Sequence, residues 1–221
     1  SLKLLLSFPS KDAFLKVSEK KILKILYSQK RGRKSTFPAP EILKAAKNSI
    51  GITSSIYEEI LKSKIRRLLI LQKELKRVEH IFIEKCNSSH SNELEILKSI
   101  KGLKDVTSSH FIAEIGNIKR FSSAKKLIAY AGVDPSVYES GEFRGKGRIS
   151  KRGNRSLRRV LYLMAVSVVR VNEVFREYFL KKRAQGKSYK QAIMAVIHKL
   201  LRIIYVLLSR QVLFNPSYHS L

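Results

Sequence analysis

A glycine-rich basic loop is the part of this sequence whose residue types are best suited to binding a phosphate. Four glycines lie from Gly141 to Gly153, and eight Lys or Arg but no Asp or Glu lie from Arg144 to Arg159. Glycine lets backbone amides approach a phosphate, and the helix expected after Gly153 adds unpaired amides and a partial positive charge. We therefore expect nucleic-acid phosphate contact here, the alternative being a solvated basic loop without a fixed ligand. The expected contacts are Arg144, Lys146, Arg148, Lys151, Arg152, Asn154, Arg155 and Arg158.

Three serines, Ser136, Ser140 and Ser150, lie in or beside this loop. A serine that attacks a phosphodiester needs in-line approach, neutralisation of the phosphate oxygens and a group that takes its proton. The basic residues of the loop could supply the neutralisation. Serine is also a common turn and capping residue, so for each of the three the residue type leaves both interpretations open.

A metal site is not expected on these residues. Two-metal phosphoryl transfer needs several clustered carboxylates, whereas the three Asp residues, Asp12, Asp105 and Asp134, are far apart in the sequence. The five His residues show no ligand spacing. We therefore expect no cofactor on this chain.

The charge balance points to a polyanionic partner. The 221 residues include 45 Lys or Arg and 17 Asp or Glu, a formal net charge of +28. Such self-repulsion is most simply compensated by a nucleic acid, which releases counterions when it is bound. The longest apolar runs, such as 203–208, are much shorter than the roughly 20 residues that span a bilayer, so no membrane partner is expected. A single cysteine fits a reducing, cytoplasmic location, and a start at Ser1 instead of Met suggests a fragment or a processed form.

Helical periodicity predicts the elements that must position the loop, and no strand pattern is visible, so the expected fold is all-α. Short helices are expected in residues 1–50, around a basic loop at 29–34 and a break at Pro38 and Pro40. A heptad pattern from 56 to 85 predicts a coiled-coil arm or long hairpin, although the core helix of a bundle fits as well. It ends in a polar break at 87–92. The heptad residues are Leu61, Leu68, Leu71, Leu75, Val78 and Phe82.

A tight turn at Gly102 should join two short helices within 93–116, the second capped by Asp105. This corner is similar to a helix-hairpin-helix, so Gly102 and Lys104 are candidate DNA contacts, with a plain helical corner as the alternative. A helix capped by Ser122 should then end at Gly132. Two long helices should close the chain: one is capped by Asn154 and has an apolar face reaching Phe175, and the other starts with a Ser188–Gln191 capping box. We expect a helical connector at 1–50, an arm at 51–90 and a C-terminal domain at 91–221.

A set of short motifs in a fixed order resembles the C-terminal domain of insertion-sequence transposases of the IS-one-ten type, which include the pilin-gene invertases. The resemblance covers residues 94–210 most closely. The motifs are 100–103 (IKGL), 113–118 (AEIGNI), 120–121 (RF), 127–135 (LIAYAGVDP), 140–141 (SG), 147–154 (GRISKRGN), 157–159 (LRR), 186–187 (GK) and 199–203 (KLLRI).

The resemblance implies a site-specific DNA recombinase with a serine nucleophile that becomes covalently linked to DNA. The family serine precedes a glycine between the proline motif and the motif at 147–154, which selects Ser140 here, with Ser150 second. It further implies a RuvC-like domain with a DEDD carboxylate set that holds Mg²⁺, a bridge RNA that selects the DNA, and a homo-oligomer. The acidic domain is not in this sequence, so we expect the chain to be inactive alone.

The resulting hypothesis is a DNA-binding C-terminal part of a recombinase that acts in the prokaryotic cytoplasm, associated with the nucleoid. Two alternatives remain: a non-catalytic basic helical module that binds DNA or RNA, and an inactive remnant of a mobile element. Replacement of Ser140 by Ala separates catalysis from binding alone.

Overall fold

The fold is described by a computed structural model for residues 2–27, 38–136, 139–140, 143–144 and 148–216. Within these ranges there are eleven α-helices, which confirms the all-α prediction. For residues 135–136, 139–140, 143–144 and 148 the description covers the backbone only. The chain divides into two compact units, Ser1–Val78 and Glu79–Leu221. The expected contact Lys146 and the expected basic loop at 29–34 lie outside the described residues.

The N-terminal unit is a small helical cluster around four buried residues, Leu4, Phe8, Ile22 and Ala39. Its helices are α1 (Leu2–Ser7), α2 (Lys11–Leu15), α3 (Glu19–Tyr27), α4 (Ala39–Lys47) and the first part of α5 (Ser55–Ser89). Pro40 lies inside the first turn of α4, where a missing backbone amide breaks no helical hydrogen bond. The break predicted at Pro38 and Pro40 therefore coincides with the start of α4.

Helix α5 is a single helix of 35 residues, as the heptad pattern predicted, and it continues to Ser89 instead of ending in a break at Asn87. Its heptad residues differ in environment along the helix. Ile65, beside the pattern, is 4% exposed, whereas Leu71 and Leu75 are 65% and 69% exposed. Leu71, Leu75 and Val78 of the heptad are therefore exposed apolar side chains, whereas Phe82 packs against the core of the C-terminal unit.

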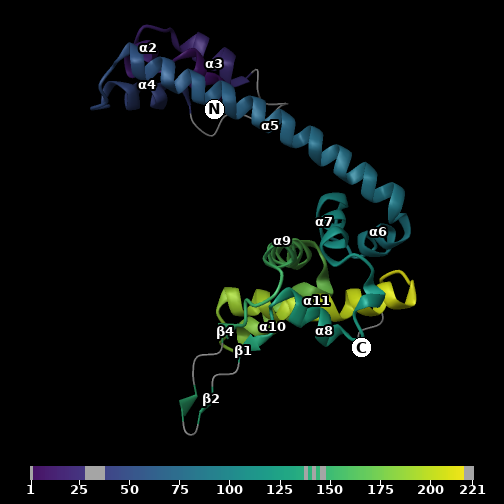
Figure 1. The fold of residues 1–221 in the computed structure, drawn as a ribbon. Helices are drawn as coiled ribbons and strands as arrows, with labels where there is room; N and C mark the ends of the chain where they lie inside the picture. The colour runs from purple at the N-terminus through teal and green to yellow at the C-terminus, as the bar shows by residue number, and fades with distance from the viewer. Residues whose placement is uncertain (1, 28–37, 137–138, 141–142, 145–147, 217–221) are drawn as a thin grey trace. The chain divides into compact units, whose positions relative to one another are not determined.

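The C-terminal unit packs its helices around α11 (Tyr189–Arg210), which contacts α6, α8, α9 and α10 (Figure 1). The other elements are α6 (Ser91–Lys98), α7 (Asp105–Ile115), a 3₁₀ turn at Ile118–Arg120, α8 (Ala124–Ala131), α9 (Arg155–Val171) and α10 (Glu173–Ala184). Its core includes the fully buried Phe111, Leu161, Phe175 and Leu200. Burial of apolar side chains such as these is the main favourable contribution to folding.

Several predicted helix boundaries need correction. The helix expected from Asn154 to Phe175 is two helices, because Asn172 adopts an extended backbone that ends α9 and begins α10. Both helices pack against the same core, so apolar residues keep a helical spacing through Asn172 and do not indicate the break. The N-caps of α7 and α8 are Lys104 and Ser123, one residue away from the predicted Asp105 and Ser122. The Asn154 cap and the Ser188–Gln191 capping box are confirmed.

The sequence pattern gave no strands, yet two short antiparallel ladders lie between α8 and α9. Strand β1 (Pro135–Ser136) pairs with β4 (Arg148–Ile149), and β2 (Glu139–Ser140) pairs with β3 (Phe143–Arg144). Each strand has only two residues, too few for an alternating pattern to be recognised. In Figure 1, β2 lies farther from the helices than β1 and β4.

Helix α11 is long and apolar enough to cross a bilayer by length and composition, with a mean hydropathy of 1.9 over its apolar window, although no membrane partner was expected. Half of that window is buried inside the unit. Its position among four other helices accounts for the apolar composition, because a central helix must be apolar on most of its faces.

Candidate nucleic-acid interface

The base of the basic loop is a close crossing of two glycines, one at each end of the loop. Gly132 ends α8 in a left-handed conformation with φ of 63°. Gly153 comes just before α9, and a Cβ placed on it would lie 2.2 Å from the Tyr130 carbonyl oxygen and 2.4 Å from the Gly132 nitrogen. No side chain fits at such distances. Gly153 is therefore a packing glycine, whereas the sequence interpretation had assigned it to phosphate approach.

Hydrogen bonds tie the two ends of the loop together across this crossing. The backbone amides of Lys151 and Asn154 donate to the carbonyls of Gly132 at 3.1 Å and Tyr130 at 2.8 Å. Ser150 bonds Asp134 twice: its amide donates to the Asp134 carbonyl at 2.9 Å, and its hydroxyl donates to the Asp134 carboxylate at 2.7 Å. Residues 130–134 and 150–154 are therefore held together at the base of the loop, and we call this set of contacts the α8–α9 junction.

Asn154 has a structural role at the start of α9. Its side-chain oxygen accepts from the Leu157 amide at 3.0 Å, and its side-chain nitrogen donates to the Glu114 carboxylate at 2.7 Å. Hydrogen bonding by Ser156 and then by Asn154 holds the pKa of Glu114 below its ordinary value, despite the opposing effect of burial. Both functional ends of the Asn154 side chain are thus occupied, so this predicted contact residue positions the helix.

Arg158 is also occupied within the unit. Its guanidinium Nη1 donates to the carbonyls of Ala131 at 3.0 Å and Gly153 at 3.1 Å. On the other side of the junction, Nε2 of His198 lies 2.7 Å from the Val133 carbonyl oxygen. These side chains satisfy carbonyls at the end of α8 that the helix leaves without partners.

The beginning of α9 combines free amides with exposed cations. The amides of Arg155 and Ser156 donate to no acceptor in the described part of the chain, as expected for the first turn of a helix. Lys151, Arg152 and Arg155 are exposed, and none forms an ion pair with a described Asp or Glu side chain. Lys151 has a left-handed backbone with φ of 55°, so the turn before the helix is also conformationally costly. Such a terminus attracts an anion.

The loop itself is described by its backbone pairing. Ser140 lies opposite Phe143, and Ser136 lies opposite Arg148. Arg144 is in β3, opposite Glu139. Ser140 and Arg144 thus belong to the outer ladder, while Ser150 lies at the junction. The structure separates the two candidate nucleophiles by their place in the loop.

The corner between α6 and α7 is packed against α9. Gly102 has φ of 110°, and an added Cβ would lie 3.0 Å from the Val168 Cα. Its carbonyl accepts from the Ser167 hydroxyl at 2.6 Å. This close approach explains a glycine here without a bound phosphate, whereas Lys104 is exposed at the start of α7.

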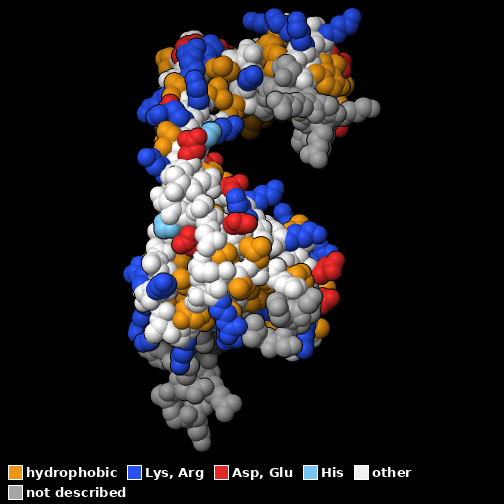
Figure 2. All heavy atoms as spheres, turned by 90° about the vertical axis from the view of Figure 1, so that its right-hand side faces the viewer, with side chains coloured by type: hydrophobic (Ala, Val, Ile, Leu, Met, Phe, Trp, Pro, Cys, Tyr) orange, Lys and Arg blue, Asp and Glu red, His pale blue; other side chains and the backbone are white. Residues whose placement is uncertain are grey.

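Figure 2 shows Lys and Arg side chains recurring over the face in view, with fewer Asp and Glu side chains.

Across the described residues, no three His, Cys, Asp or Glu side chains come together as metal ligands. These residues therefore do not fit a Mg²⁺ site.

Sequence reasoning did not identify Glu114 and His198 as partners of the junction. Glu114 lies 40 residues from Asn154, and His198 lies 65 residues from Val133. The motif at 113–118 contained Glu114, but no local pattern indicated its partner. Arg158 was identified as a cation, while its two carbonyl acceptors depend on the tertiary structure.

Comparison with known proteins shows similarity to a transposase family within the C-terminal unit. Residues 94–180 match the family described as transposase IS116/IS110/IS902. An uncharacterized 42 kDa protein of insertion element IS900 from Mycobacterium paratuberculosis is 24% identical over 219 residues, 98% of this chain and 54% of that protein. The pilin gene-inverting protein of Moraxella bovis is 32% identical over 137 residues, 61% of this chain and 42% of that protein.

A probable family 20 transposase of Pseudomonas aeruginosa is 25% identical over 195 residues, 87% of this chain and 56% of that protein. The chain thus spans about half the length of these relatives. The resemblance to transposases of the IS-one-ten type is confirmed, and the α8–α9 junction lies within the matched segment. Residues 94–180 of this chain are therefore similar to the transposase IS116/IS110/IS902 family.

Proposed function

We propose that the C-terminal unit binds DNA through the start of α9 and the basic loop, as the serine-bearing part of a site-specific recombinase. The observation that carries this proposal is the start of α9, where two helix amides have no acceptor and the exposed cations Lys151, Arg152 and Arg155 have no ion-pair partner among the described residues. Backbone amides and guanidinium groups are the donors that phosphate oxygens prefer. A protein that acts on bacterial DNA in this way works in the cytoplasm.

The proposed role of the α8–α9 junction is to fix the position of the N-terminus of α9. Asn154 and Arg158 use their polar atoms within the unit, so they position α9 and leave direct contact to their exposed neighbours. Arg144, Lys146 and Arg148, carried by the loop, are proposed to hold the scissile phosphate. Lys104 at the start of α7 is a proposed secondary phosphate contact, next to the packing residue Gly102.

Ser140 is the proposed nucleophile. Its hydroxyl oxygen forms a bond to phosphorus while the bond from phosphorus to a sugar oxygen breaks, and the serine proton passes to a base. Ser150 is the second candidate, because its hydroxyl already donates to the Asp134 carboxylate at 2.7 Å. That contact also closes the base of the loop, so the two serines need an experiment to separate them.

Mg²⁺ is proposed to bind the acidic domain that the resemblance implies and not the residues described here. The relatives are about twice as long as the chain, which leaves room for such a domain in the longer protein. A bridge RNA and a homo-oligomer are further proposals. The exposed apolar side chains of α5 support association between copies, and the net charge of +28 suits a second polyanion.

The test is formation of a protein–DNA adduct by the longer protein with its acidic domain, detected on a denaturing gel with end-labelled DNA. Ser140→Ala should abolish the adduct and leave DNA affinity within about twofold. Ser150→Ala should reduce stability but retain an adduct. An adduct that survives Ser140→Ala and disappears with Ser150→Ala would transfer the nucleophile to Ser150. An adduct that survives both substitutions would exclude both serines as the nucleophile, whereas DNA binding by the parent without any adduct would identify a non-catalytic nucleic-acid module.

A further inference from the structure

A groove on the C-terminal unit shares no residue with the α8–α9 junction. It has a volume of about 540 Å³ and is lined by α10, α11 and the stretch that follows α11. Val174 of α10, Ile203 and Val206 of α11, and Leu213 are among its apolar lining residues. An aliphatic floor of this size accepts apolar side chains in preference to water.

Three cations of α11 line the same groove: Lys199, Arg202 and Arg210. Arg202 and Arg210 follow Lys199 by three and eleven residues, and these spacings keep all three cations on one face of the helix. No Asp or Glu lines the groove, and none of the three cations forms an ion pair within the described part of the chain. Burial lowers the pKa of Lys199, against the opposite influence of Glu177, so part of the groove is already shielded from water.

The two aromatic rings that line the groove, Tyr178 and Phe214, already contact side chains of the same unit. The ammonium groups of Lys199 and Lys182 lie 4.8 Å and 5.2 Å from the centre of the Tyr178 ring. The Phe214 ring is stacked on Phe175 with centres 6.3 Å apart. Single-stranded nucleic acids bind grooves in which aromatic rings are free to stack on bases. The groove therefore favours an occupant with aliphatic or aromatic side chains and carboxylates.

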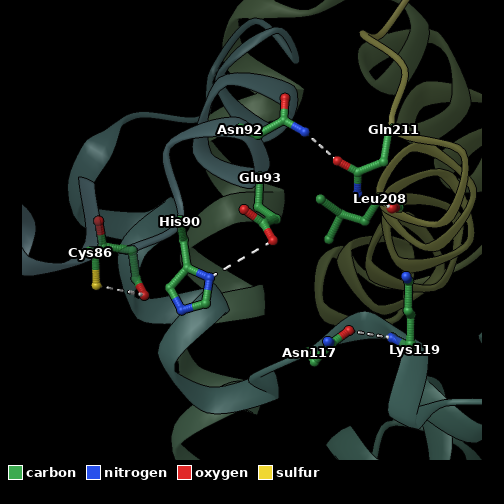
Figure 3. A network of polar contacts seen from close by, with 9 residues as sticks. Cys86, His90, Asn92, Glu93, Asn117, Lys119, Leu208 and Gln211 are labelled. Atoms are coloured by element: carbon green, nitrogen blue, oxygen red, sulfur yellow. Dashed lines mark hydrogen bonds and ion pairs between the residues drawn. The ribbon is translucent and has the colours of Figure 1, made fainter. Parts of the chain in front are cut away.

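The wall formed after α11 is fixed to the rest of the unit. The Phe214 amide donates to the Ser99 hydroxyl at 2.8 Å. Gln211 caps α11 with φ of 55°, donates to the Leu208 carbonyl at 2.6 Å and accepts from Asn92 of α6. Figure 3 shows the Gln211 side chain between Asn92 and Leu208. The groove is thus formed before any partner binds, which lowers the entropic cost of association.

We propose that this α10–α11 groove binds an acidic amphipathic helix of a protein partner. The apolar face of that helix packs on the floor, and its carboxylates pair with Lys199, Arg202 and Arg210. Helices that lay an apolar face into a groove commonly anchor through side chains spaced three and four residues apart. The complementary charges set the orientation and exclude basic helices.

The experiment measures fluorescence anisotropy with a labelled model peptide of about 18 residues, with Leu at helical spacing and Glu at the remaining positions. A second peptide carries Ser in place of each Leu and keeps the same charge. At roughly 0.2 M salt, where general attraction is screened, the Leu peptide should bind at least about tenfold more tightly than the Ser peptide. Equal binding of the two peptides would overturn the proposal.

Arg202→Glu should weaken binding of the Leu peptide about tenfold or more. Lys190→Glu is the matched control, because it makes the same charge change at an exposed position of α11 that does not line the groove, and it should stay within about twofold of the parent. Equal losses in the two variants would contradict the proposal. Displacement of the Leu peptide by oligothymidylate, with a loss of oligothymidylate binding specific to Arg202→Glu, would instead identify a nucleic-acid groove.

Discussion

The α8–α9 junction and helix α5 use their residues in opposite ways. At the junction, two glycines cross at contact distance, and Asn154 and Arg158 have partners within the unit. In the second half of α5, Leu71 and Leu75 are 65% and 69% exposed. The junction forms its contacts within one chain, whereas the exposed apolar side chains of α5 are the basis of the proposed association between copies.

We propose that this difference reflects two functions, ligand binding at the junction and association through α5. A junction closed by its own contacts can hold the start of α9 in a fixed position for a ligand. A helix with an exposed apolar seam adds little to the stability of its own chain but can bring copies together. Each of the following variants should disrupt either the junction or α5 and leave the other region unchanged.

Gly153→Ala should have the largest effect. The new Cβ would meet the Tyr130 carbonyl oxygen at 2.2 Å, so the two ends of the loop must separate, at a cost of about 3 kcal/mol or more. Urea unfolding of the chain measures this loss. Gly186→Ala is the control: its φ of 79° makes alanine unfavourable, but the Cβ would meet nothing within 4 Å. A cost for Gly153→Ala no larger than the roughly 1 kcal/mol expected for this control would contradict the close crossing.

Leu71→Glu should act on assembly instead of folding. Leu71 is already partly buried, so its loss costs roughly 1 kcal/mol per helix, which is about 2 kcal/mol for two helices and about thirtyfold in the dissociation constant. Analytical ultracentrifugation measures the change, with unfolding monitored in parallel. Lys73→Glu, two residues away on a solvated face of the heptad, should leave the association nearly unchanged. A chain that stays monomeric at all concentrations would remove the proposed role of α5.

Arg158→Met and Arg155→Met separate positioning from contact at the start of α9. Arg158→Met leaves two carbonyls without their donor and should cost about 1–2 kcal/mol of stability. Arg155→Met removes an exposed cation and should keep stability within about 0.5 kcal/mol while it weakens DNA binding. Unfolding curves and DNA anisotropy on both proteins check the pair. The reverse pattern would mean that the two arginines have exchanged roles.

Glu114→Gln should have the smallest effect, seen chiefly in its pH dependence. The pKa of Glu114 is lowered by Ser156 and Asn154 from an ordinary value of 4.5. A lowered pKa contributes stability that is present above about pH 4.5 and is lost as the pH falls through the folded-state pKa. The variant should therefore lose about 1 kcal/mol or less near neutral pH and approach the parent in acid. A difference that grows as the pH falls would contradict this account.

The sequence predicted most helices and the position of the loop because apolar spacing, caps and glycines are local signals. The Asn154 cap and the Ser188–Gln191 box were found from a few adjacent residues. The break at Asn172 was not, because apolar spacing continues through it. The role of Arg158 could not be predicted either. The sequence identifies a cation but does not show whether its partner is a phosphate or the Ala131 carbonyl.

The salt dependence of DNA binding tests the central claim most directly. A variant with Lys151, Arg152 and Arg155 all changed to Gln is compared with Arg170→Gln, an exposed position at the other end of α9. The slope of log affinity against log salt should fall by about 2–3 for the triple variant and by much less for Arg170→Gln. Equal slopes for the parent and the triple variant would show that the start of α9 does not hold DNA phosphates.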